Sequence, residues 1–102
     1  MTRKIFFLDR AVDDIKIAYD WYEEQQPGLG KRFEESVQKT VAEIAKFPFA
    51  YPNKFKNSRE TIIPKFPFVI IYRFTDTAIF VQAVFPCRMN PLKKYGIDIA
   101  FY

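Results

Sequence analysis

The stretch Phe66–Pro86, FPFVIIYRFTDTAIFVQAVFP, contains two runs of strand length separated by Asp76 and Thr77. The runs Phe68–Thr75 and Ala78–Phe85 are rich in Ile, Val, Phe and Tyr, which favour β-strands. A gap of two residues allows only a hairpin, so we expect the two strands to be antiparallel neighbours.

Segments on both sides extend this hairpin. Arg59–Pro64 is a third run of strand length, and the short gap Lys65–Pro67 again allows only a hairpin. Upstream, prolines, asparagines and a serine predict an irregular loop over Phe49–Ser58. Downstream, the tail Gly96–Tyr102 alternates Ile, Ile and Phe with other residues, so it either adds an edge strand or docks on a partner.

The first half of the chain predicts one strand and two helices. Lys4–Leu8 is a short apolar run, after which Asp9 offers an N-cap. Apolar residues then recur at helical spacing, first at Ala11, Ile15, Ala18 and Tyr22 and later at Phe33, Val37, Val41, Ile44 and Phe47. Pro27–Gly30 separates the two sets, and so short a connection predicts an antiparallel helical hairpin. We expect Trp21 and Tyr22 to pack between the first helix and the sheet.

This order of elements is typical of the α+β class. We expect an N-terminal strand and an antiparallel two-helix hairpin packed on one face of a mainly antiparallel sheet of three or four strands. Residues 1–102 are predicted to form a single domain, because a chain of this length has no room for a second core.

The composition excludes several classes of site. The chain has no histidine and one cysteine, which rules out Ser-His-Asp and Cys-His couples, histidine metal ligands and a zinc site made of cysteines. We therefore expect no metal and no cofactor, and we expect Cys87 to be a small packed side chain. Because no apolar run approaches the roughly 20 residues that span a bilayer and no signal peptide is evident, we expect a cytoplasmic protein without a membrane partner.

The positive charge is concentrated in the second half of the chain. Residues 1–50 carry eight Lys or Arg against nine acids, whereas residues 51–102 carry eight against three. This asymmetry is typical either of a solvated surface or of a positive face that meets phosphate or an acidic protein segment.

The register of the hairpin decides which side chains share a face. If Thr75 faces Ala78, one face carries apolar side chains alone and should meet the helices: Phe68, Ile70, Tyr72, Phe74, Ile79, Val81, Ala83 and Phe85. The opposite face is mixed, and we predict that it binds a protein partner. With two neighbouring cations, its predicted binding residues are Val69, Ile71, Arg73, Phe80, Gln82, Val84, Arg59 and Lys65. The alternative is that the C-terminal segment folds back and covers this face.

Several motifs, in this order along the chain, resemble the RelE/ParE superfamily of toxins, which includes plasmid stabilisation proteins. These motifs are Ala11-x-x-Asp14-Ile15, Trp21-Tyr22, Pro27-Gly28-Leu29-Gly30-x-x-Phe33, Pro48-x-x-Tyr51-Pro52, Phe66-Pro67-Phe68-x-Ile70-x-Tyr72 and Val84-Phe85-x-x-Arg88-x-Asn90-Pro91. The resemblance covers residues 4–95. It implies the toxin of a type II toxin–antitoxin module, neutralised by a cognate antitoxin whose C-terminal segment covers the sheet or the active groove.

The superfamily divides by target. RelE-like members cleave mRNA on the ribosome, and the resemblance would give this activity to Arg88, Lys94 and Tyr95. ParE-like members instead inhibit DNA gyrase. The strand position that carries an Arg in the nucleases is Val69 here, and Pro86 stands where relatives often have His. We therefore favour a ParE-like toxin that binds gyrase and is not an enzyme. The alternatives are a RelE-like endoribonuclease and a degenerate member that binds its antitoxin without harming cells.

Overall fold

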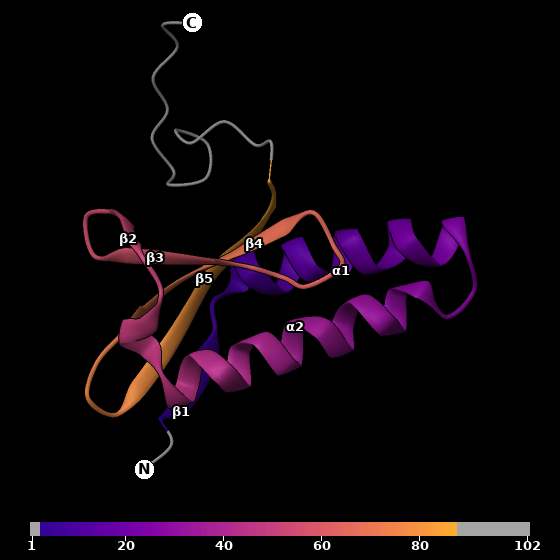
Figure 1. Ribbon diagram of the computed structural model, residues 1–102. Coiled ribbons are helices and arrows are strands. Elements are labelled where there is room, and N and C mark those ends of the chain that lie inside the picture. Colours follow the sequence, from indigo (N-terminus) through magenta and orange to yellow (C-terminus); the bar gives the residue numbers. More distant parts are fainter. Residues whose placement is uncertain (1–2, 88–102) are drawn as a thin grey trace, which may run out of the picture.

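The computed structural model describes residues 3–87 of the chain. Its elements are β1 (Lys4–Phe7), α1 (Asp9–Gln25), α2 (Leu29–Lys46), the 3₁₀ turn η1 (Pro48–Ala50), β2 (Asn53–Phe55), β3 (Ser58–Ile62), β4 (Phe68–Phe74) and β5 (Ala78–Pro86). The two helices run side by side along the sheet (Figure 1). This arrangement confirms the α+β fold and the helical hairpin. Within the described residues, no helix is both long and apolar enough to cross a membrane.

The sheet has five strands in the order β1-β5-β4-β3-β2. The two predicted hairpins are present, since β3 pairs with β4 and β4 pairs with β5 in antiparallel fashion. The N-terminal strand β1 pairs with β5 in parallel. Part of the expected loop forms the edge strand β2, in which Asn53 pairs with Arg59. Its three residues are too few to show the alternation from which strands are predicted.

The helical hairpin depends on a close approach at Gly30. The Gly30 amide donates a hydrogen bond to Glu23 Oε1 at 2.9 Å. A Cβ atom at Gly30 would lie 2.6 Å from both the Tyr19 carbonyl oxygen and Glu23 Cγ, so α2 can start this close to α1 only with glycine there. Gly28 has another role, because its φ of 88° places it in the left-handed region while the space around it is open.

The main core lies between the helices and one face of the sheet. Phe33, Val37, Val41 and Ile44 of α2 pack with Ile70, Tyr72, Ile79 and Val81 of the sheet. Tyr22 belongs to this core as predicted, but Trp21 is 56% exposed, which corrects the prediction for that residue. Because a helix turns by about 100° per residue, Trp21 lies outside the stripe that carries Ala18 and Tyr22.

A bulge at Gln82 changes the register of the β4–β5 hairpin. Tyr72 pairs with Val81 but Ile71 pairs with Ala83, so Gln82 is an extra residue in β5. Before the bulge the pairing is the predicted one, and after it each side chain lies on the opposite face from that expected. The predicted uniform register is therefore wrong beyond Gln82. Apolar residues occupy both faces over this segment, so the sequence pattern does not distinguish the two registers.

The bulge moves Ala83 and Phe85 to the second face of the sheet, away from the helices. There they form a buried cluster with Val69 and Ile71. Val84 moves the other way and is 2% exposed in the main core, which corrects its predicted place on the partner-binding face. Val69 and Ile71 are on the predicted face, but they are 6% and 1% exposed and do not form an open apolar patch.

The edge of β5 beyond β1 is closed by a side chain from α1. β1 pairs with β5 only as far as Val81, and the Val84 amide then donates to Asp14 Oδ2 at 3.0 Å. Two residues later Pro86 has no N–H to offer. Burial raises the pKa of Asp14, while the Val84 hydrogen bond and the charge of Arg10 act in the opposite direction.

Substituting Gly30→Ala is expected to destabilise the protein more than Gly28→Ala does. The added methyl group at residue 30 meets backbone and side-chain atoms at 2.6 Å, and overpacking of this kind costs about 1–3 kcal/mol. At residue 28 the cost is left-handed strain alone, about 1 kcal/mol. Urea denaturation of the two variants measures the difference, and a Gly30→Ala protein as stable as the wild type would disprove the close approach.

Asp14→Ala and Asp14→Asn are expected to differ at neutral pH. The alanine leaves the Val84 N–H without an acceptor, at a cost of about 1–2 kcal/mol, whereas an asparagine oxygen keeps the hydrogen bond and avoids burying a charge. Because the folded pKa of Asp14 is raised, the wild type should gain stability relative to Asp14→Asn as the pH falls through that pKa. Equal free energies of unfolding for the two variants at neutral pH would contradict this role.

Candidate functional site

Arg73 is held on the second face by a relay of side chains. Arg73 Nε donates to Ser58 Oγ at 3.3 Å, and the Ser58 hydroxyl donates to Gln82 Oε1 at 2.8 Å. Ser58 is only 3% exposed, whereas Arg73 is exposed. The bulge therefore also affects the polar surface. The extra residue Gln82 lies where its side chain holds the Ser58 hydroxyl group, and Ser58 in turn orients Arg73.

Aromatic side chains lie next to this arginine. Phe80 pairs with Arg73 across the hairpin, and its ring stacks on that of Phe6 with centroids 5.6 Å apart. Phe6 is 47% exposed. Arg73, Phe80 and Gln82 thus occupy the face that the sequence predicts, and each remains a candidate for partner binding.

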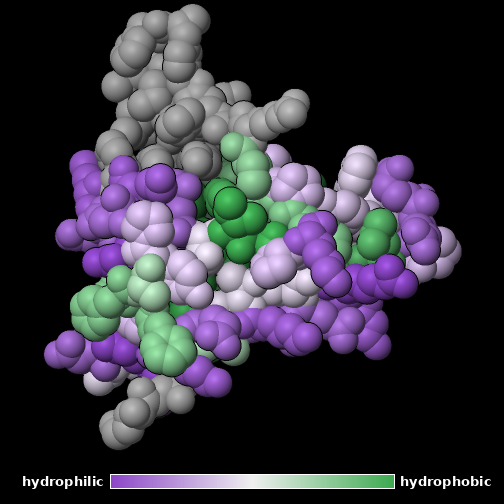
Figure 2. Space-filling view, viewed as in Figure 1, coloured by the Kyte–Doolittle hydropathy of each residue, from purple (hydrophilic) through white to green (hydrophobic). Residues whose placement is uncertain are grey.

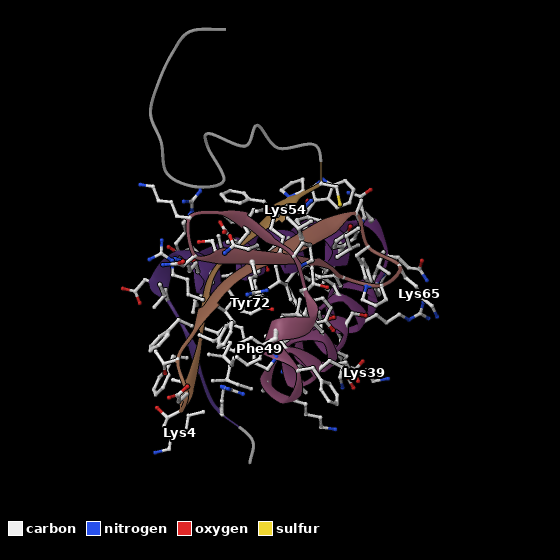
Figure 3. All side chains as sticks on the ribbon, turned by 60° about the vertical axis from the view of Figure 1, so that its left-hand side comes forward. Lys4, Lys39, Phe49, Lys54, Lys65 and Tyr72 are labelled. Atoms are coloured by element: carbon white, nitrogen blue, oxygen red, sulfur yellow. The ribbon has the colours of Figure 1, made fainter. Side chains whose placement is uncertain are left out.

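Arg59 points to the face of β3 opposite to that of Ser58 and Arg73, and it remains a predicted neighbour of the partner-binding face. It pairs with Tyr72, and its Nη1 donates to the carbonyl oxygens of Tyr51 at 2.7 Å and Phe49 at 3.5 Å. Strand alternation explains the difference, because Ser58 and Arg59 are consecutive and must point to opposite faces. Figure 3 shows the Phe49 side chain beside the strand that carries Tyr72.

Tyr72 is unsuited to proton transfer. Its hydroxyl group donates a hydrogen bond to the Pro48 carbonyl oxygen at 2.7 Å, and the side chain is fully buried. Burial raises its pKa to about 12, while the Arg59 charge acts in the opposite direction. This tyrosine anchors η1 to β4 and stays neutral at physiological pH.

The two arginines nevertheless meet at the end of the sheet. A depression of about 370 Å³ is lined by Asn53, Asn57, Arg59, Arg73, Phe74, Thr75 and Phe80, and we call it the arginine pocket. Arg59 reaches it from one face of the sheet and Arg73 from the other. Guanidinium and amide groups supply the hydrogen-bond donors of this pocket, and such a lining suits an anionic group of a partner.

Lys65 is not part of this pocket. It lies in the β3–β4 turn with a φ of 70° and lines a separate groove with Arg32 and Lys39 of α2. Figure 3 shows Lys65 and Lys39 on one side of the molecule, away from Phe49. The prediction that Lys65 adjoins the partner-binding face is therefore corrected, because the turn that carries it bends toward the helices.

The position at which a nuclease would carry arginine is apolar in this structure. Val69 pairs with Ile62 and Phe85, and it belongs to the buried second-face cluster. The adjoining depression, about 520 Å³, is lined by Tyr51, Pro52, Lys54, Glu60, Thr61, Ile62, Val69 and Cys87. Among the described residues of that lining Lys54 is the one cation, and this part of the arrangement differs from a cationic cradle for phosphate.

Three predicted catalytic residues, Arg88, Lys94 and Tyr95, lie outside the described residues, as does the tail 96–102. Cys87 is exposed at the end of β5, which corrects its predicted packing. From residue 3 to residue 87, no group of three or more His, Cys, Asp and Glu side chains is placed to hold a metal ion.

Two residues of the site could not be identified from the sequence pattern. Arg3 donates from Nε to the Thr75 carbonyl oxygen at 2.7 Å, a contact between residues 72 positions apart. Phe49 is 69% exposed in η1. Figure 2 shows that apolar patches on this view of the molecule are set in a largely hydrophilic surface. The parallel pairing of β1 with β5 brings Arg3 to this end of the sheet, and that pairing has no local signal.

Comparison with known proteins identifies a family. Residues 5–91 match the family model described as the ParE toxin of the type II toxin–antitoxin system, parDE. Toxin ParE2 of Mycobacterium tuberculosis is 28% identical over 92 residues, which cover 89% of this chain and 88% of the relative.

Solved structures show the same fold. A chain of the chromosomal ParDE toxin–antitoxin system from P. aeruginosa superposes with a TM-score of 0.61 at 15% identity, covering 83% of this chain and 96% of that chain. A mutant of the E. coli toxin RelE, in complex with an antitoxin RelBc peptide, superposes with a TM-score of 0.65 at 14% identity, covering 99% of this chain and all of that one. On the family match, this chain belongs to the ParE toxin family of type II toxin–antitoxin systems.

Proposed function

We propose that the protein inhibits bacterial growth by binding DNA gyrase in the cytoplasm, without cleaving RNA, and that a cognate antitoxin neutralises it. The observation that carries the proposal is the apolar setting of Val69, buried with Ile71, Ala83 and Phe85 at the position where a ribosome-dependent nuclease would carry arginine. A cation at that place could stabilise the charge that develops on a cleaved phosphate, and a buried valine cannot.

Two buried tyrosines, Tyr72 and Tyr22, are also unsuited to catalysis. The Tyr72 hydroxyl is committed to Pro48, and burial holds its pKa at about 12. Burial likewise raises the pKa of Tyr22, which packs in the main core. Neither side chain is suited to transfer a proton to or from an RNA substrate near neutral pH.

An antitoxin partner is supported by the family and by the neighbouring structures. The E. coli DinJ–YafQ toxin–antitoxin complex contains a chain with this fold, with a TM-score of 0.58. On this chain, Arg73, Phe80 and Gln82 form the accessible part of the predicted partner-binding face. The arginine pocket adjoins them and offers donors to an anionic group of a partner.

Two assays with the purified protein test the proposal, one for inhibition of DNA gyrase and one for cleavage of mRNA. In a supercoiling assay with DNA gyrase, relaxed plasmid and ATP, we expect the protein to inhibit supercoiling. In a translating extract we expect mRNA to remain uncut. The matched variant Arg88→Ala/Tyr95→Ala should inhibit gyrase as the wild type does and should still arrest growth when expressed in bacteria.

Two other results would contradict the proposal, and each would indicate one of the alternative functions. Ribosome-dependent cleavage of mRNA, lost in Arg88→Ala/Tyr95→Ala, would establish the endoribonuclease alternative. Folded protein that affects neither gyrase nor mRNA and causes no growth defect would indicate a degenerate member that binds its antitoxin alone. Circular dichroism of each preparation shows whether an inactive protein is folded.

A further inference from the structure

Two arginines from distant parts of the chain converge on the same pair of aromatic rings. Arg3 Cζ lies 5.9 Å from the Phe49 ring centroid and 5.5 Å from that of Phe74. Arg59 Cζ lies 6.0 Å and 5.5 Å from the same two centroids. The rings themselves meet edge to face at 4.7 Å. Both guanidinium groups lie 5.5 Å from the Phe74 ring centroid, so the two positive charges are at most about 11 Å apart.

Both guanidinium groups are fixed in place by the backbone. Arg3 donates to the Thr75 carbonyl oxygen, and Arg59 donates to those of Tyr51 and Phe49. In residues 3–87, the contacts of both arginines are to carbonyl oxygens and rings, and no carboxylate neutralises either charge. Two guanidinium groups oriented in this way present preorganised cationic donors to an anion that lies between them.

The arginine pocket continues this positive surface. Arg59 and Phe74 line it, and Arg73 adds a third guanidinium group that Ser58 orients from the second face. Asn53 and Asn57 add side-chain amides to the same lining. The three arginines come from the segment before β1, from β3 and from β4, so the folded sheet assembles them.

The arrangement of the arginines over the two rings favours an acidic peptide over a nucleic acid as the ligand. Proteins that bind single strands stack bases on open aromatic faces. Here both guanidinium groups already lie over Phe49 and Phe74. What remains accessible is a set of donors beside an apolar ring, and carboxylate side chains of an extended peptide accept hydrogen bonds from such donors. We propose that Arg3, Arg59 and Arg73, arranged around Phe74, bind an acidic polypeptide segment of a partner protein. This inference does not depend on the cellular target.

Fluorescence anisotropy with the full-length protein tests this site. The probe is a fluorescein-labelled peptide of alternating Glu and Ala, and we expect binding that weakens as salt is added. An exposed ion pair changes affinity by up to about fivefold, so Arg3→Gln/Arg59→Gln should weaken binding about tenfold. The matched double variant Arg32→Gln/Lys39→Gln removes the same charge from the exposed surface of α2 and should change binding less than twofold.

A single variant, an uncharged peptide and a nucleic acid serve as controls for this experiment. If the double variant fails to fold by circular dichroism, Arg3→Gln alone is used and should weaken binding about threefold. The same peptide with Gln in place of Glu should not bind. Equal losses in both double variants would overturn the site, because they would show a general charge effect. Absence of peptide binding, or tighter binding of an oligothymidylate of equal charge, would overturn the choice of ligand.

Discussion

The extra residue in β5 determines what each face of this protein presents. Gln82 has no partner in β4, and from that point the side chains of β5 exchange faces. Val84 thereby enters the main core, while Ala83 and Phe85 join Val69 and Ile71 in a buried cluster on the second face. The Gln82 side chain accepts a hydrogen bond from Ser58, which in turn orients Arg73. One irregularity in one hairpin thus couples apolar burial to the placement of a surface cation.

The two ends of the sheet differ in polarity and charge. At one end, Val69 belongs to a buried apolar cluster with Ile71, Ala83 and Phe85. At the other end, arginines from three separate parts of the chain gather near Phe74. A toxin of the ParE family that acts by binding requires a surface of defined shape and charge more than it requires acids and bases. The proposed binding surface lies where the sheet ends.

Most of the fold could be predicted because its signals are local. Helical spacing, turn residues and strand-length runs identify the helical hairpin and strands β3, β4 and β5. The bulge could not be predicted, because residues 83–85 are apolar at both parities and either register buries apolar side chains there. Arg3 could not be identified from the pattern, and the face from which Arg59 reaches the arginine pocket could not be assigned. The first depends on the long-range parallel pairing of β1, and the second on a register that only the folded sheet defines.

The register of the hairpin is therefore the point on which this account depends most. Nuclear Overhauser contacts across the hairpin of the isotope-labelled protein measure it directly. The structure predicts backbone contacts between Ile71 and Ala83 and between Ile70 and Val84. Contacts between Ile71 and Gln82 and between Ile70 and Ala83 would show a hairpin without the bulge. They would return Val84 to the second face and contradict the account.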